Sequence, residues 1–279
     1  MKSPLKHIIV LLAALFAGIH ARAQTVKVAA AADLKFAMEE LASQFEKQSG
    51  TKLDVTYGSS GNFLTQIQNG APFDLFFSAN SEYPKKLEAA GLAEPGTRYE
   101  YAVGHIVIWT PNDSGINAAK EGWKCLLDQH VKKIAVANPE HAPYGRAAVA
   151  ALKKARIYEQ VKDKLVYGEN ISQAAEFVQS GNAQAGIVAL SLAISPAMKD
   201  GNRWEVPPRL YPPIFQSVVL LKTSENKDAA HKFLKFVKSK AGQGILERFG
   251  FTIPIQASDI LTMWLGDAGR TLATLSPQR

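Results

Sequence analysis

One short pattern recurs four times in this chain: an apolar run of strand length, a loop of small or neutral polar residues, and a run of helix length. The clearest copy starts at Ile134–Ala137, continues through a proline-containing loop, and reaches a helical run over residues 144–155 that Tyr144-Gly145 opens. Short apolar strands that alternate with helices favour a parallel sheet whose two faces are covered by helices. No fixed period of sequence identity accompanies the repetition, so the pattern predicts an α/β fold and not a solenoid.

The alternation of predicted strands and helices occurs once in each half of the chain. The predicted strands lie at 26–31, 53–57, 73–78, 134–137, 164–167 and 184–190, and the helices between and after them at 34–48, 63–68, 84–90, 144–155 and 172–179. Because both halves follow the same plan, we predict two lobes, each a mainly parallel sheet flanked by helices. A chain of 279 residues is long enough to give each lobe a core of its own.

Two segments break the alternation and are interpreted as crossings between the lobes. Residues 101–109 form an apolar run with no helix after it, and residues 216–222 form a strand that follows two proline pairs. We therefore predict lobe 1 at 24–103 and 214–254, lobe 2 at 104–213, and a loosely docked C-terminal extension at 255–279. Two crossings leave a cleft that hinges near 101–104 and 213–217, and clefts of this kind hold ligands in α/β proteins.

The first 23 residues are predicted to be a secretory signal peptide. Lys2 and Lys6 precede an apolar run at 8–19, and Ala21-Arg22-Ala23 fits a cleavage site. An uncleaved membrane anchor is the alternative, but this run is shorter than the roughly 18 residues that span a bilayer. The single cysteine, Cys125, is expected to pack in the core and cannot form an internal disulfide. An exported chain without internal disulfides fits the bacterial periplasm better than eukaryotic secretion.

The starts of four predicted helices are candidates for one anion site. The first backbone N–H groups of a helix have no partner inside it, and they carry the positive end of the helix dipole. The four starts hold small or neutral residues: Ala32-Asp33, Ser59-Ser60-Gly61, Tyr144-Gly145 and Asn170-Ile171-Ser172. Neutral donors suffice for a small dianion, because hydrogen bonds to a charged acceptor are strong in a cleft that excludes water.

Two other classes of anion partner are disfavoured. The turn at 58–62 lacks the lysine that a nucleotide-binding phosphate loop needs after its glycine. The formal net charge is +7, of which three positive charges lie in the predicted leader, and no basic run is interleaved with aromatic residues. The sequence therefore gives no indication of nucleic-acid binding.

Taken together, the motifs of this chain resemble those of the periplasmic molybdate-binding proteins of ABC transporters. The resemblance rests, in chain order, on AAAADL at 29–34, GSSG at 58–61, NGAPFDLFFSA at 69–79, NPEHAPYG at 138–145, GIVA at 186–189 and FGFTIP at 249–254. It implies the type II periplasmic-binding-protein fold, capture of a tetrahedral oxyanion, and delivery to a membrane permease.

The resemblance also implies which residues bind the oxyanion. Carried over position by position, the family's ligand-binding residues are Ala32, Asp33, Ser59, Ser60, Tyr144 and Ile171. Many members have a tyrosine after the GIV run, whereas this chain has Ala189, so Tyr144 is the candidate replacement from the opposite side of the cleft. Asp33 stands where the family usually has a small hydroxyl or amide residue.

Asp33 allows two interpretations. The favoured one is that its side chain caps its own helix near Phe36 and offers only its backbone N–H to the ligand. The other is that its carboxylate accepts a proton from the ligand, which phosphate can supply near neutral pH and molybdate, tungstate and sulfate cannot. We predict that molybdate affinity survives Asp33→Asn; tight phosphate binding that this change abolishes would contradict the prediction.

A binding protein is favoured over an enzyme. Outside the predicted leader the chain has His105, His130, His141 and His231, without the spacing of metal ligands, and no G-x-S-x-G motif. An exported enzyme acting on a phosphorylated or carboxylated substrate would have only Asp33 or His141 as general base, and His141 is expected merely to fix its loop. A rate unaffected by changing both residues would remove that alternative.

We therefore predict a monomeric periplasmic protein without catalytic activity, cofactor or bare metal ion. Its ligand is expected to be molybdate or tungstate, and its partner an ABC-transporter permease. A receptor for phosphate or sulfate is the alternative within the same class.

Overall fold

The first of two five-stranded sheets is assembled from both ends of the chain. The computed structural model describes residues 25–255, and its first sheet has the order β2-β1-β3-β10-β4. Its strands are β1 (Thr25–Ala31), β2 (Lys52–Gly58), β3 (Leu75–Ser78), β4 (Tyr99–Gly104) and β10 (Ile214–Leu220). β1 pairs in parallel with β2 and β3, and β10 runs antiparallel to both β3 and β4.

The second sheet repeats this arrangement with the middle of the chain. Its order is β7-β6-β8-β5-β9, with β6 parallel to β7 and β8, and β5 antiparallel to β8 and β9. The strands are β5 (Ile106–Pro111), β6 (Ile134–Ala137), β7 (Leu165–Gly168), β8 (Ala185–Ala189) and β9 (Gly201–Glu205). In each sheet one strand, β10 or β5, runs against the direction of the other four, so each sheet is mixed but mainly parallel, as predicted.

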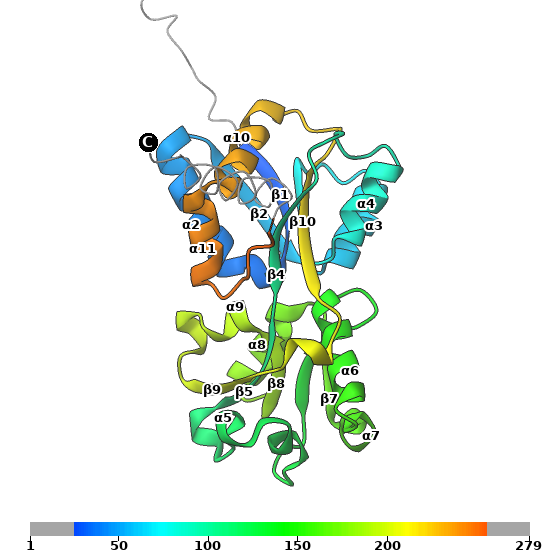
Figure 1. Cartoon of the computed structure of the whole chain (residues 1–279), viewed down its shortest axis with the longest axis vertical. Helices are drawn as coiled ribbons and strands as arrows, with labels where there is room; N and C mark the ends of the chain where they lie inside the picture. Colours follow the sequence, from blue (N-terminus) through cyan, green and yellow to red (C-terminus); the bar gives the residue numbers. More distant parts are fainter. Residues whose placement is uncertain (1–24, 256–279) are drawn as a thin grey trace, which may run out of the picture.

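Helices cover both faces of the first sheet. Figure 1 shows α2, α10 and α11 on one side and α3 and α4 on the other. They are α2 (Lys35–Ser49), α3 (Ser60–Gln68), α4 (Glu82–Ala89), α10 (Lys227–Lys238) and α11 (Lys240–Arg248). Gly50 caps the end of α2 with a left-handed φ of 69°, which glycine adopts without strain. Leu34, Met38, Leu41 and Phe45 recur at helical spacing and lie buried in the core of this lobe.

The second lobe has shorter helices, several of them of the 3-10 type. Its helices are α5 (Ala118–Glu121), α6 (Pro143–Lys154), α7 (Tyr158–Val161), α8 (Ile171–Gln179) and α9 (Leu190–Ala193). Among the described residues the 3-10 turns are η1 (Ala32–Leu34), η2 (Asn112–Ser114), η3 (Gly122–Leu127), η4 (Lys162–Lys164), η5 (Pro196–Met198) and η6 (Pro208–Leu210). Cys125 lies in η3 and is fully buried, as expected from the sequence.

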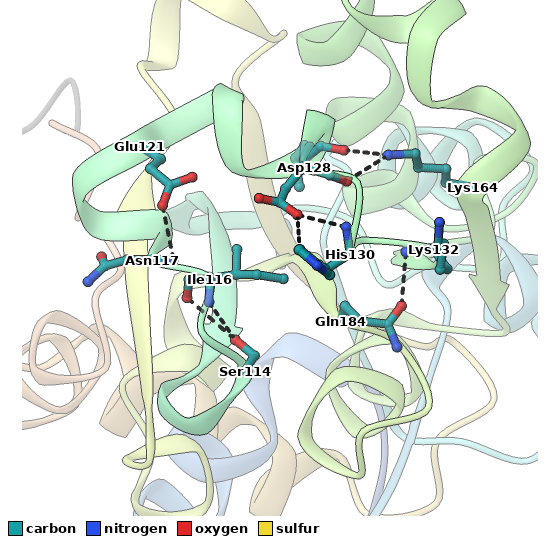
Figure 2. A network of polar contacts seen from close by, with 10 residues as sticks. Ser114, Ile116, Asn117, Glu121, Asp128, His130, Lys132, Lys164 and Gln184 are labelled. Carbon is teal, nitrogen blue, oxygen red and sulfur yellow. Dashed lines mark hydrogen bonds and ion pairs between the residues drawn. The ribbon is translucent and has the colours of Figure 1, made fainter.

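Polar contacts hold the loops of the second lobe that lead into β6 and β8 (Figure 2). The Asp128 carboxylate accepts from the backbone N–H of His130 at 2.7 Å, and the Lys164 ammonium donates to the carbonyls of Leu126 and Asp128. Gln184 accepts from the backbone N–H of Lys132 at 3.1 Å. These contacts fix a part of the lobe that does not contribute to the cavity described below.

Two neighbouring strands connect the lobes. The predicted single strand 101–109 is divided at His105 into β4 and β5, which belong to different sheets. The chain returns through β10, whose first residue, Ile214, pairs with Gly104 at the end of β4. In Figure 1 both crossings lie together between the upper and lower lobes. The crossings lie at the positions predicted from the sequence, and their action as a hinge stays a prediction.

The predicted signal peptide and nearly all of the predicted extension lie outside the described residues. Within 25–255, no helix has the length and apolar character needed to cross a membrane.

Candidate functional site

All six residues predicted to bind an anion line one small cavity between the lobes. The cavity is small, with a volume of about 10 Å³. Its lining consists of Ala31, Ala32, Asp33, Gly58, Ser59, Ser60, Ala79, Ala142, Pro143, Tyr144 and Ile171. None of the six predicted residues is more than 5% exposed, so the structure shows the lobes closed over this space.

The four helix starts converge on the cavity because each follows the end of a strand. The Ala32-Asp33 pair follows β1 as η1, and α3 starts after β2 with Ser59 as its N-cap. In the other lobe, Pro143 is the first residue of α6, and Asn170 caps α8 by accepting from the Gln173 N–H at 3.0 Å. The first-turn N–H groups, including those of Tyr144 and Ile171, have no acceptor inside their own helices.

Ser60 is positioned as a hydroxyl donor. The sequence predicted a turn over 58–62 and a helix from Phe63, but α3 already begins at Ser60. The Ser60 side chain is fully buried, and its Oγ accepts the backbone N–H of Ala79 at 2.9 Å. Its hydroxyl hydrogen remains available for an acceptor in the cavity.

Asp33 does not cap its helix, so the favoured sequence interpretation of this residue was wrong. η1 has no side-chain cap, and the Asp33 carboxylate turns towards the other lobe. Its Oδ2 accepts from the Tyr144 hydroxyl at 2.9 Å and from Gln216 Nε2 at 2.6 Å. Its Oδ1 is buried and has no hydrogen-bond partner. Asp33 therefore bonds to residues that are distant in the sequence and not to the N–H groups of the helix it was predicted to cap.

Burial governs the protonation of this pair. Loss of solvent raises the pKa of Asp33 to about 6, against the opposing effect of its hydrogen bonds from Gln216 and Tyr144. Burial, together with the nearby Asp33 charge, raises the pKa of Tyr144 well above its usual value. The Tyr144 hydroxyl therefore stays protonated and donates a hydrogen bond to Asp33.

Gln216 is a site residue that the sequence interpretation missed. Its side chain is fully buried on β10, and its Oε1 accepts from the Tyr101 hydroxyl at 2.7 Å. Because the oxygen is used in this way, the amide nitrogen faces Asp33 and the Tyr144 oxygen, at 2.6 and 3.1 Å. The one available signal was a glutamine inside an otherwise apolar strand.

Backbone contacts between the lobes surround the cavity. Ser172 Oγ donates to the Ala32 carbonyl at 2.9 Å, and Ser191 Oγ donates to the Asp33 carbonyl at 2.8 Å. On the opposite side, the Gly61 N–H donates to the His141 carbonyl at 2.9 Å. A Cβ on Gly61 would lie 2.5 Å from that oxygen, so glycine is required for this close approach.

His141 lies beside the cavity and not in its lining. Its ring nitrogen Nε2 lies 3.0 Å from the Glu169 carbonyl oxygen, which fixes the loop as the sequence predicted. Ala189, at the position where the family often has tyrosine, is fully buried at the end of β8. Within residues 25–255, no cluster of histidine, cysteine, aspartate or glutamate could hold a metal ion.

The lining contains no lysine, arginine or histidine side chain. The residues that line it carry backbone N–H groups and the polar side chains of Ser59, Ser60, Tyr144 and Asp33, and the Tyr144 hydroxyl already donates to Asp33. Such a set can surround a small anion with neutral donors. Asp33 is the exception, because its carboxylate, when ionised, would repel the anion.

Comparisons with known proteins agree with this architecture. Residues 26–252 match the family model described as bacterial extracellular solute-binding protein. The molybdate-binding protein ModA of Azotobacter vinelandii is 38% identical over 252 residues, covering 90% of this chain and 99% of that protein. ModA of Rhodobacter capsulatus is also 38% identical, over 83% of this chain and 89% of its own length.

A solved structure agrees as well. The periplasmic molybdate-binding protein of A. vinelandii superposes with a TM-score of 0.77 at 34% identity, covering 82% of this chain and 100% of that one. The resemblance inferred from the motifs is thereby confirmed, and the chain belongs to the family of bacterial extracellular solute-binding proteins.

Proposed function

We propose that this protein captures molybdate, or the similar tungstate, between its two lobes and delivers it to the permease of an ABC transporter. The observation that carries the proposal is the closed cavity, to which both lobes contribute neutral donors at helix starts. Relatives named as molybdate-binding proteins support the choice of anion.

The size of the cavity supports a small ion as cargo. Its volume of about 10 Å³ is far below the roughly 300–1,000 Å³ of pockets that hold drug-sized ligands. A tetrahedral oxyanion offers four acceptors, which matches the convergence of donors from Ser60, Tyr144 and Ile171 and from the backbone after β1. In this proposal the six lining residues predicted from the sequence are the ligand-binding residues.

The proposal places the protein in the periplasm as a monomer without a resident cofactor. The leader pattern of the sequence and the similarity to the periplasmic molybdate-binding protein of A. vinelandii support this location. The protein is proposed to bind and not to catalyse, because its relatives are binding proteins.

The anion can be identified directly. Native mass spectrometry of the protein purified from its host should show a mass increment equal to one molybdate or tungstate ion. Isothermal titration calorimetry of the stripped protein should then give strong one-to-one binding for those two anions and weaker binding for sulfate and phosphate. Absence of heat and of thermal protection with group-six oxyanions would contradict the proposal, and preference for sulfate or phosphate would replace its anion.

A further inference from the structure

A carboxyl group in the proposed anion cavity requires an explanation. Asp33 is 1% exposed, and a carboxylate beside a dianion in a medium of low dielectric constant is strongly repulsive. Its two oxygens also differ, since Oδ2 accepts two hydrogen bonds while Oδ1 is buried without a partner. A buried polar atom without a partner is costly unless a ligand or a proton satisfies it.

We propose that Asp33 is a proton-dependent specificity residue: Oδ1 carries a proton in the loaded protein and donates it in a hydrogen bond to an oxygen of the bound oxyanion. Capture of a fully deprotonated dianion such as molybdate then takes up one proton from solvent, and release returns it. This inference rests on the proposed function and adds to it a dependence of affinity on pH.

The hydrogen bonds around the carboxyl determine which oxygen carries the proton. Oδ2 receives one hydrogen from the Tyr144 hydroxyl and one from the Gln216 amide, so its acceptor capacity is used. Gln216 cannot turn its amide around without losing the bond from Tyr101 to Oε1. The proton therefore resides on Oδ1, and Asp33 lines the cavity in which the ligand lies.

The other groups packed around Asp33 leave it as the one site for this proton near neutral pH. The ionisable groups facing it are Tyr144 on α6 and Tyr101 on β4, whose pKa values are both raised well above the usual one, mainly by burial. Tyr211, beside Tyr144, also has a raised pKa because it is buried. β10, α3, α8 and α9 contribute neutral groups only: Gln216, Ser59, Ser60, Ile171, Ser172 and Ser191.

The same geometry separates two kinds of oxyanion. Molybdate brings no proton near neutral pH, so the proton on Oδ1 has to come from solvent. Hydrogen phosphate brings its own proton and can donate it to an ionised Asp33 without net uptake. Proton uptake measured during binding therefore distinguishes a proton taken from solvent, as with molybdate, from a proton brought by the ligand, as with hydrogen phosphate.

The test is titration of the full stripped protein with molybdate at pH 6, 7 and 8, each in two buffers of different ionisation enthalpy. Because the pKa of Asp33 in the ligand-free protein is about 6, the Kd should rise about 50-fold from pH 6 to pH 8. Uptake should approach one proton per molybdate at pH 8. Asp33→Asn supplies a permanent N–H donor, so its Kd should be independent of pH and its proton uptake zero.

Two further variants make the test specific. Asp54 is an exposed aspartate on β2 of the same lobe, so Asp54→Asn makes the same change of charge outside the cavity and should keep the wild-type pH profile. Tyr144→Phe removes a hydrogen bond that lowers the pKa of Asp33 and should move the onset of the pH dependence upwards.

A wild-type Kd for molybdate that is flat between pH 6 and pH 8 would overturn the inference, and so would an unchanged pH profile in Asp33→Asn. Failure of the proposed function looks different: neither the wild type nor Asp33→Asn, both folded by circular dichroism, would bind molybdate at any pH.

Discussion

Ser60 and Asp33 are both buried in the cavity lining, but burial affects their side chains differently. Ser60 is neutral and has its acceptor satisfied by Ala79, so burial costs it little and leaves one hydrogen to donate. Asp33 loses the solvation of its charge, which raises its pKa to about 6. Ser60 therefore contributes to the affinity for the anion, whereas Asp33 makes that affinity depend on pH.

Replacing Ser60 with alanine should weaken molybdate binding without unfolding the protein. A hydrogen bond to a charged group contributes about 1.5–3 kcal/mol, so the Kd should rise roughly 10- to 100-fold. The Ala79 N–H also loses its acceptor, which should lower the free energy of unfolding by about 1–3 kcal/mol. Calorimetry and chemical denaturation check both effects, and Ser43→Ala, at an exposed position on α2, should change neither.

Asp33 should also make the stability of the ligand-free protein depend on pH. Its pKa is about 6 when folded and near 3.8 when exposed, so the folded protein binds the proton more tightly. The stabilisation is complete below about pH 4 and is lost as the pH rises through 6, on the order of 3 kcal/mol in total. Denaturation at pH 4, 5, 6 and 7 should show this slope in the wild type relative to Asp33→Asn.

The comparison with Asp33→Asn cancels the other acidic groups, which both proteins share. A difference between the two free energies of unfolding that stays constant from pH 4 to pH 7 would show that Asp33 is not the group responsible.

The residues of the site were only partly predictable because their partners are distant in sequence. Ala32, Ser59, Ser60, Tyr144 and Ile171 lie at the ends of local strand–loop–helix units, which an amphipathic pattern reveals. The orientation of Asp33 depends on Tyr144 and Gln216, which are 111 and 183 positions away. A local preference for helix capping was therefore the wrong guide.

Among the elements, most strands of the two sheets were predictable, including the crossing strands at 101–109 and 216–222, whereas the edge strand β9 was not. Apolar runs identify β1, β3, β6 and β8, whose residues are almost all buried. β9 was missed because its five residues are polar or half-exposed and lack an apolar pattern. The direction of a strand near the sheet edge depends on where the chain crosses between the lobes. The residues of that strand alone do not reveal it.

Closure of the two lobes should depend on Gly61 in the first turn of α3, because this position leaves no room for a side chain. In Gly61→Ala, the new Cβ would lie 2.5 Å from the His141 carbonyl oxygen in the closed form. Overpacking costs about 1–3 kcal/mol, so molybdate affinity should fall roughly 5- to 100-fold. The lobes should stay folded, because alanine suits a helix at least as well as glycine does.

Calorimetry together with thermal unfolding of the ligand-free protein checks this expectation. Gln66→Ala, an exposed position on the same helix, serves as the matched control and should bind normally. Wild-type affinity in Gly61→Ala would mean that the approach of α3 to His141 is not needed for binding.

For the whole molecule, ligand binding should be accompanied by a change of shape. The two crossings meet where Gly104 pairs with Ile214, so the lobes can rotate about a narrow hinge. Saturating molybdate should therefore lower the radius of gyration measured by small-angle X-ray scattering, and Gly61→Ala should show a smaller decrease. Identical scattering with and without bound anion would contradict hinge closure.

The sealing of the cavity also has a kinetic consequence. None of the six lining residues is more than 5% exposed, so parting of the two halves is the expected route by which an ion held among them leaves. The dwell time of the cargo is then limited by how often the halves part, whatever the strength of the individual bonds. A membrane partner that holds the halves apart would accelerate unloading without altering a single atom that touches the ion.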